Sequence, residues 1–264
     1  MNFSLRKDIY NLGVLLALSV FLFGANLGSF GLLDPDEPFY SLTAREMVER
    51  NDASTPYIFG HPQFEKPIFF YWVMYACFKV FGISEWSARL GPCIAGVLTV
   101  LITYLWARAL FRRSDTAFIC AAILATAAQF IVVSRIVLTD VYLCLFVTAV
   151  LYSFTLGYLY PRWRAAAWHL LFVFCALGFL TKGMLGFLLP FMGIGLYAVL
   201  SGELALLVRL PWLTGGLLFA IVGFPWYGLM TAQHGTGFLK HFFIHENIRR
   251  FFVAEHKGFD RFYF

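Results

Sequence analysis

Residues 33–71, LDPDEPFYSLTAREMVERNDASTPYIFGHPQFEKPIFFY, form the longest charged and turn-rich interval of a chain that otherwise consists mostly of long apolar runs. The interval opens with three carboxylates, Asp34, Asp36 and Glu37, and closes with Glu65-Lys66-Pro67 between aromatic residues. Ionisable residues beside apolar runs are costly in a membrane and commonly have a function. We therefore expect any chemistry of this chain to lie here.

The composition is that of a membrane protein. Of the 264 residues, 60% are hydrophobic and 13% are charged, whereas soluble domains are about half apolar and about a quarter charged. The apolar runs are continuous and long enough to span a bilayer, which favours helices over the alternating strands of a β-barrel. The sequence therefore predicts an all-α polytopic membrane protein. Its net charge of +5 is interpreted as orienting loop charge that contacts membrane lipids, and no nucleic acid partner is predicted.

The loop charges predict a topology. Arg6 and Lys7 precede the first apolar run, which places the N-terminus in the cytoplasm. That run is too long for a signal peptide and lacks a cleavage site, so it is interpreted as an uncleaved span. The same rule predicts about seven spans in all. They are Asn11–Leu33, Trp86–Leu110, Ala117–Val133, Leu138–Tyr160, Ala165–Leu180, Met184–Leu200 and Pro211–Met230.

Two further helices are predicted between the first two spans. Acids and a proline at Asp36-Glu37-Pro38 indicate a helix that runs to about Arg50 and stops at Asn51-Asp52. Ser54–Phe64 contains breakers and is expected to be extended or looped. The aromatic stretch Pro67–Gly82 is short for a span. If it lies along the membrane surface, the arginine-rich turns all fall on the cytoplasmic side, so it is interpreted as an interfacial helix.

The predicted topology brings ionisable residues to one face of the membrane. The carboxylates near Asp36 and Glu37 suit a metal site, a general base or simply a helix cap. Lys66 suits a phosphate, or is a lysine that extends to the membrane surface. Asp140 opens a span, where it also fits an ordinary helix start. The full set is Asp36, Glu37, Glu65, Lys66, Asp140, Lys182, Glu246, Arg249 and Arg250.

Other motifs exclude common kinds of site. Lys182 follows Thr181 in a tight turn, but the Gly-x-x-x-x-Gly-Lys pattern of a nucleotide-binding loop is absent. His241 and His245 have the spacing of metal ligands, but no acid partner is specified, and residues 238–252 also fit an amphipathic surface helix. The five cysteines lie in apolar runs without a Cys-x-x-Cys pair, which predicts inert thiols.

A set of motifs, in a fixed order along the chain, resembles a known family. The set resembles the polytopic glycosyltransferases of the GT-C fold, in particular the bacterial ArnT-like lipid A aminoarabinose transferases, which are related to the protein O-mannosyltransferases. The matching stretches are Asp36-Glu37 with Tyr40 and Ala44-Arg45-Glu46-Met47, Phe64-Glu65-Lys66-Pro67 with Phe70-Tyr71-Trp72, Ser84-Glu85-Trp86 with Ala88-Arg89-Leu90, Leu138-Thr139-Asp140, Thr181-Lys182-Gly183, Pro225-Trp226-Tyr227, and Glu246-Asn247 with Arg250-Phe251.

The resemblance implies a GT-C helix bundle that transfers a sugar, with inversion, from a polyprenyl-phosphate carrier to a periplasmic lipid, glycan or protein acceptor. It implies Asp36 as the catalytic base, with Glu37 and Asp140 as further acidic site residues. The implied phosphate-binding residues are Lys66, Lys182, Arg249 and Arg250, and the implied substrate pocket contains Tyr40, Arg45, Glu65 and Tyr71. No cofactor is required, because the donor carries its own activation energy. A divalent metal near Glu65 is implied in relatives, but Asn247 stands where they often have histidine.

The resemblance also implies location and domain organisation. The chain is expected in the bacterial inner membrane as an N-terminal transmembrane catalytic module, residues 1–264. Residues 34–82 would be its first periplasmic loop and residues 231–264 the start of a later one, with further spans and a periplasmic domain to follow. The competing interpretations are a lipid or solute transporter, which would carry repeats or mid-span acids, and a structural subunit, which would not need charges gathered on one face.

Overall fold

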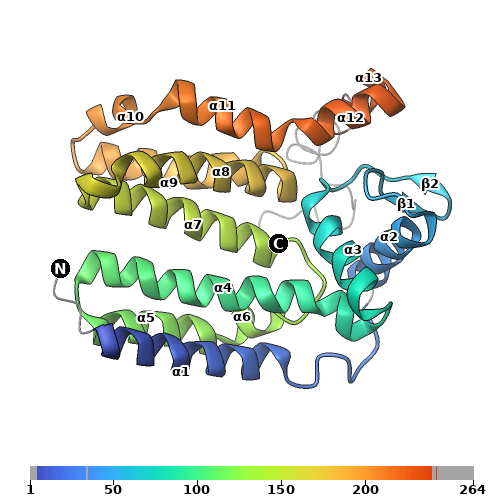
Figure 1. Cartoon of the computed structure of the whole chain (residues 1–264), viewed down its shortest axis with the longest axis horizontal. Coiled ribbons are helices and arrows are strands. Elements are labelled where there is room, and N and C mark those ends of the chain that lie inside the picture. Colours follow the sequence, from blue (N-terminus) through green and yellow to red (C-terminus); the bar gives the residue numbers. More distant parts are fainter. Residues whose placement is uncertain (1–4, 34, 240–241, 243–264) are drawn as a thin grey trace, which may run out of the picture.

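Long apolar helices run side by side along one axis, and a smaller group of elements covers one end of them (Figure 1). The computed structural model describes residues 5–33, 35–239 and 242. The long axis is followed by α1 (Leu5–Gly24), α4 (Glu85–Phe111), α5 (Ser114–Thr126), α6 (Ala128–Val133), α7 (Asp140–Leu159), α8 (Arg164–Lys182), α9 (Leu185–Leu200), α11 (Trp212–Gly223) and α12 (Pro225–His234). Shorter turns are η1 (Pro161–Trp163), α10 (Ala205–Arg209) and α13 (Thr236–Leu239).

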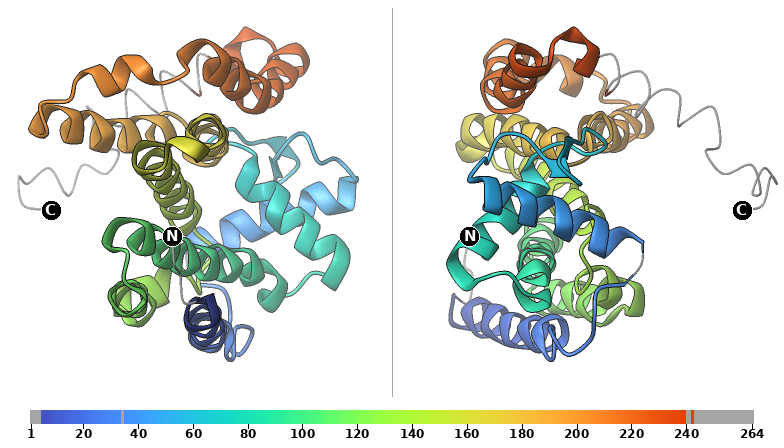
Figure 2. Two further views of the ribbon diagram at one scale, coloured as in Figure 1. Left: turned by 60° about the vertical axis from the view of Figure 1, so that its left-hand side comes forward. Right: turned by 90° about the vertical axis from the view of Figure 1, so that its right-hand side faces the viewer.

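The helices stack in layers, with α4 and α7 in the middle (Figures 1 and 2). On one side α4 packs against α1 and α5, and on the other α7 packs against α8 and α9. Within the described residues, α1, α4, α7 and the helical segment Pro161–Lys182 are long and apolar enough to cross a membrane, and α11 with α12 would be a fifth span if the bent pair is one. The helical membrane bundle predicted from the sequence is confirmed, and the count of about seven spans stays a prediction.

Three predicted spans have different boundaries in the structure. The first helix ends at Gly24 rather than Leu33, and in the loop that follows the backbone carbonyls of Leu27, Phe30 and Gly31 accept hydrogen bonds from Arg89. The third is divided at Ala127, whose backbone is extended. The last is bent by 45° between α11 and α12, where Pro225 cannot continue the helix.

The group at the end of the bundle comes from the charged interval. α2 (Asp36–Arg50) has the predicted bounds, and Asn51 ends it in the left-handed conformation at φ 54°. The predicted extended stretch holds a hairpin of β1 (Tyr57–Ile58) and β2 (His61–Pro62). α3 (Phe69–Phe81) follows and packs on α2 and α4.

The tight turn between α8 and α9 depends on glycine. Gly178 and Gly186 face each other across this turn, and a Cβ atom on Gly186 would overlap the backbone of Gly178. We expect Gly186→Ala to lower the free energy of unfolding by about 1–3 kcal/mol, as overpacked cores do. Thermal unfolding of the purified protein measures this. Gly195→Ala is the matched control, because a Cβ there meets nothing within 4 Å; equal losses in both variants would contradict the close-approach argument.

Candidate functional site

The centre of the candidate site is a buried ion pair between α2 and α4. The side chains of Glu37 and Arg89 are 2% and 0% exposed. Arg89 donates from Nε to Glu37 Oε1 at 2.9 Å and from Nη2 to Oε2 at 2.7 Å. Its remaining N–H groups donate to the carbonyls of Leu27, Phe30 and Gly31 at 2.8–2.9 Å. This planar, five-donor geometry is one that lysine cannot supply.

The Glu37 carboxylate also accepts two backbone hydrogen bonds. Leu33 N–H donates to Oε2 at 2.8 Å and Val137 N–H to Oε1 at 2.7 Å. Burial alone would raise the pKa of Glu37, but the hydrogen bonds from Arg89, Leu33 and Val137 outweigh it and lower the pKa below its ordinary value. Glu37 therefore stays charged and joins four segments of the chain.

The bond to Val137 places the start of α2 beside the segment that leads into α7. Asp36 is exposed at the first position of α2, and Asp140 is the first residue of α7. Lys182, the last residue of α8, donates from Nζ to Asp140 Oδ1 at 2.7 Å. Asp36, Asp140 and Lys182, which lie far apart in the sequence, thus gather at one end of the bundle, as predicted.

A second part of the site lies between α2 and α3. The rings of Tyr40 and Tyr71 are 6.2 Å apart in an edge contact, and both residues are buried. Burial raises the pKa of Tyr71 well above its ordinary value, and the neighbouring Tyr40 and Glu65 raise it further. Glu65 and Lys66 precede α3 and are half-buried. Tyr71 and Glu65, both predicted for the substrate pocket, are therefore electrostatic neighbours.

This second part contains buried polar atoms without well-formed hydrogen bonds. Among the described residues, the buried polar atoms of Ser41, Gln63 and Tyr71 form no hydrogen bond of good geometry, although Thr43 and Gln63 lie close enough to Tyr71 to oppose the rise in its pKa. Such atoms cost about 1–3 kcal/mol each, and native proteins keep them where they serve a purpose. These buried polar side chains, close to Glu65, could therefore form hydrogen bonds to a bound ligand.

Other predicted site residues are placed differently or lie outside the described residues. Arg45 is exposed and its Nε donates to Glu49 Oε1 at 2.7 Å on the outer surface of α2, away from the Glu37–Arg89 pair. Arg249 and Arg250 lie outside the described residues. Within the described residues, no group of three histidine, cysteine, aspartate or glutamate side chains could hold a metal ion, and the divalent metal near Glu65 stays a prediction.

Arg89 was not among the residues predicted for the site. Its position in the sequence did indicate a buried partner, because an arginine inside an otherwise apolar span is costly unless it is paired. Only the fold identifies that partner as Glu37, 52 residues earlier in the chain.

Comparisons with known proteins identify the family of this chain. The family model for dolichyl-phosphate-mannose-protein mannosyltransferases matches residues 12–242. An uncharacterised protein of Aquifex aeolicus is 33% identical over 247 residues, covering 94% of this chain and 55% of that protein. The undecaprenyl phosphate-alpha-4-amino-4-deoxy-L-arabinose arabinosyl transferase of Pseudomonas aeruginosa is 31% identical over 266 residues, covering 93% of this chain and 44% of the transferase.

A solved structure shares the fold. The crystal structure of ArnT from Cupriavidus metallidurans bound to undecaprenyl phosphate matches with a TM-score of 0.84 at 26% identity, over 89% of this chain and 44% of that one. The chain spans about half the length of the curated relatives it matches. Since the family model covers most of the chain and the fold agrees, this chain belongs to the dolichyl-phosphate-mannose-protein mannosyltransferase family of GT-C membrane proteins.

Proposed function

We propose that this protein is a membrane glycosyltransferase that moves a sugar from a polyprenyl-phosphate carrier to an acceptor hydroxyl, with inversion at the anomeric carbon. The observation that carries the proposal is that Asp36 lies at the same end of the bundle as the Asp140–Lys182 pair, and that Glu65 and Lys66 precede α3 at this end. The likeness to a structure that binds undecaprenyl phosphate supports the choice of donor.

Asp36 is the proposed catalytic base. Its carboxylate takes the proton of the acceptor hydroxyl while the hydroxyl oxygen forms a bond to the anomeric carbon. The bond from that carbon to the phosphate oxygen breaks on the opposite face, and its electron pair leaves with the polyprenyl phosphate. Attack from the opposite face inverts the anomeric centre. The exposed position of Asp36 leaves it accessible to an acceptor.

The leaving phosphate needs positive charge. Lys66 is the proposed phosphate contact, together with Lys182, which Asp140 positions. Arg249 and Arg250 are further proposed phosphate contacts, on the basis of the sequence alone. Charge placed where it develops in the transition state is worth a few kcal/mol, roughly as for an oxyanion donor. Glu37 belongs to the site as a positioning residue in this proposal, because its oxygens are already engaged by Arg89, Leu33 and Val137.

The proposed location is the bacterial inner membrane with the site facing the periplasm. The arginine-rich turns at 112–113 and 162–164 lie at the bundle end opposite to Asp36, which is the arrangement that the positive-inside rule requires. The named transferase relative is an undecaprenyl phosphate-alpha-4-amino-4-deoxy-L-arabinose arabinosyl transferase. Because the sequence motifs also resemble the lipid A aminoarabinose transferases, lipid A is the first acceptor to test, before other surface glycans and proteins.

Mass spectrometry of lipid A and of carrier lipids tests the proposal in cells with and without the full-length gene. We expect carrier-linked sugar to accumulate without the gene. A lipid A mass shift that is lost with the gene would identify the acceptor, whereas unchanged lipid A would point to another glycan or to protein. If neither pool changes, the transferase proposal is wrong and a transporter or structural subunit takes its place.

The Asp140–Lys182 pair provides a sharper prediction. The two side chains are 53% and 25% exposed, so the pair contributes only about 0–1 kcal/mol to stability. We expect Asp140→Asn and Lys182→Gln each to lower kcat/KM about 10- to 100-fold, as loss of one charged hydrogen bond does, with thermal unfolding unchanged.

A double variant tests whether the two residues act together. Because Asp140 positions Lys182, we expect the double variant to be no worse than the poorer single variant. Lys79→Gln is the control, since Lys79 is an exposed cation at the same end that binds Asn51. Multiplying effects in the double variant would show that the two residues work independently.

A further inference from the structure

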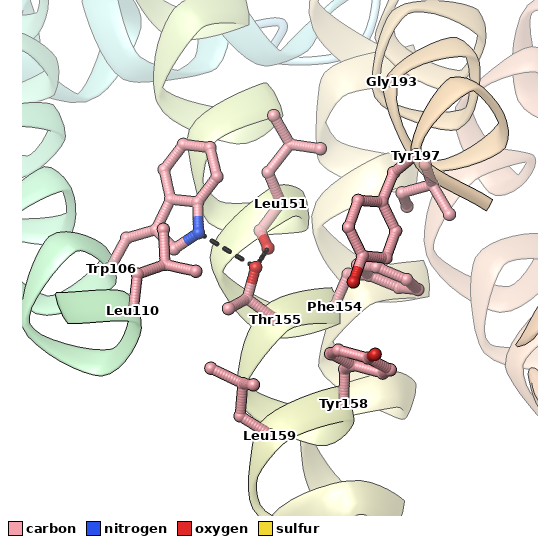
Figure 3. A pocket seen from close by; sticks show the side chains of 10 residues that line it. Trp106, Leu110, Leu151, Phe154, Thr155, Tyr158, Leu159, Gly193 and Tyr197 are labelled. Atoms are coloured by element: carbon pink, nitrogen blue, oxygen red, sulfur yellow. Dashed lines mark hydrogen bonds between the residues drawn. The ribbon is translucent and has the colours of Figure 1, made fainter. Parts of the chain in front are cut away.

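A groove lies between α4, α7 and α9 near the end of the bundle opposite to Asp36 (Figure 3). Its volume of about 400 Å³ falls in the range of small-molecule sites, roughly 300–1,000 Å³. The lining side chains converge on this space from three helices. They include Trp106 and Leu110 from α4, Thr155, Tyr158 and Leu159 from α7, and Gly193 from α9.

The few polar groups of this groove are already engaged. The Trp106 ring N–H donates to the Thr155 hydroxyl at 2.9 Å, and that hydroxyl donates to the Leu151 carbonyl at 2.8 Å. The Tyr158 hydroxyl donates to Glu203 at 3.1 Å. The walls therefore present hydrocarbon and ring faces, which suit an apolar chain and offer little to a sugar or a nucleotide.

The groove lies just inside the basic end of the bundle. Leu110 precedes Arg112-Arg113 and Leu159 precedes Arg162, all three of which are exposed. The carboxylates at this end are engaged elsewhere, because Asp8 pairs with Arg108, Asp115 with Lys7, and Glu203 with Tyr158. Among the described residues, no carboxylate forms an ion pair with Arg112, Arg113 or Arg162.

This arrangement fits one lipid molecule. Tryptophan and tyrosine at a membrane interface border headgroups, and exposed arginines beyond them attract anionic headgroups. We propose that the groove binds one acyl chain of a phospholipid with an anionic headgroup, whose phosphate lies at the Arg113 and Arg162 turns. The site is separate from the proposed catalytic end, because the 20 residues of α7 span about 30 Å at ~1.5 Å per residue.

Native mass spectrometry of the delipidated full-length protein tests this proposal. Palmitoyl-oleoyl phosphatidylglycerol and phosphatidylcholine are the probes, since they share acyl chains and differ in headgroup charge. We expect one tightly held phosphatidylglycerol and a preference over phosphatidylcholine of about fivefold for each arginine involved, as for basic residues near a membrane surface.

Glycine substitutions on α9 test the position of the chain. A Cβ on Gly193 would meet Leu151 in ordinary contact at 3.6 Å, so Gly193→Phe fills the groove without a backbone clash. Gly195→Phe is the matched control on the same helix, because a Cβ there meets nothing within 4 Å. We expect retention of phosphatidylglycerol to fall at least tenfold in the first variant and to stay unchanged in the second.

A headgroup variant keeps the test informative if Gly193→Phe does not fold. Arg113→Gln is exposed and should lower the preference for phosphatidylglycerol about fivefold, whereas Arg50→Gln at the other end should not. Equal retention of the two lipids by the wild type, or equal effects of the two phenylalanine variants, would overturn the proposal. So would the absence of any retained phosphatidylglycerol in the wild type.

Discussion

Replacing Asp36 by asparagine is expected to lower kcat by about 10²–10⁴-fold, the usual contribution of a general base. Asparagine keeps the size and the hydrogen-bonding oxygen of aspartate but cannot take the acceptor proton. Within the part of the chain that the structure describes, Asp36 forms no hydrogen bond or ion pair comparable to those of Glu37, so thermal unfolding and binding of undecaprenyl phosphate should be unchanged. Steady-state rates and native mass spectrometry of the full-length protein measure the two effects separately.

A carboxylate on the same helix provides the control. Glu49 is exposed on α2 and pairs with Arg45, so Glu49→Gln removes a charge without touching the proposed base. We expect its rate to stay close to that of the wild type. A wild-type rate in Asp36→Asn would assign the proton transfer to another group, with Asp140 the next to test.

The largest effect on stability is expected from Arg89→Ala. The change leaves the Glu37 carboxylate buried without its partner and frees the carbonyls of Leu27, Phe30 and Gly31. Removing one side of a buried ion pair costs about 3–5 kcal/mol. Thermal unfolding in detergent should therefore show a large loss, and Arg108→Ala, at a more exposed pair with Asp8, should show a smaller one.

The pH dependence of this loss has a definite sign. The pKa of Glu37 is lower in the folded protein than its ordinary value of 4.5. Its contribution to stability is therefore complete above pH 4.5 and is lost as the pH falls from there through the lowered folded pKa. We expect the difference between wild type and Arg89→Ala to narrow below pH 4.5. If the difference in stability between the two proteins stays constant with pH, the freed carbonyls, rather than Glu37, account for most of the lost stability.

Local signals in the sequence were enough for much of the fold. The bounds of α2 follow from its acids, its proline and Asn51, and the apolar runs predict the helices of the bundle. The first span was extended too far, because the local loop signals in residues 25–33 were overlooked: Gly28 and Gly31 disfavour a helix, and Asn26 adopts a positive φ of 53°. The break at Ala127 has no strong local signal, since neither proline nor glycine marks it.

The candidate site was predictable in composition but not in pairing. The one-sided gathering of Asp36, Lys66, Asp140 and Lys182 follows from topology alone. The partnership of Lys182 with Asp140, and the engagement of Glu37 by Arg89, depend on contacts between residues 42 and 52 positions apart. A sequence pattern shows where the charged residues lie and which segments have the periodicity of a helix. It does not specify which charged groups form pairs in the fold.

The Glu37–Val137 hydrogen bond has a consequence for synthesis. The two residues are 100 positions apart, which a ribosome covers in roughly 5–20 s at ~5–20 residues per second. During that interval α2 has left the ribosome, but the last donor to its buried carboxylate has not yet been made. Residues 33–71 therefore reach their final structure only after the segment that leads into α7 has been synthesised.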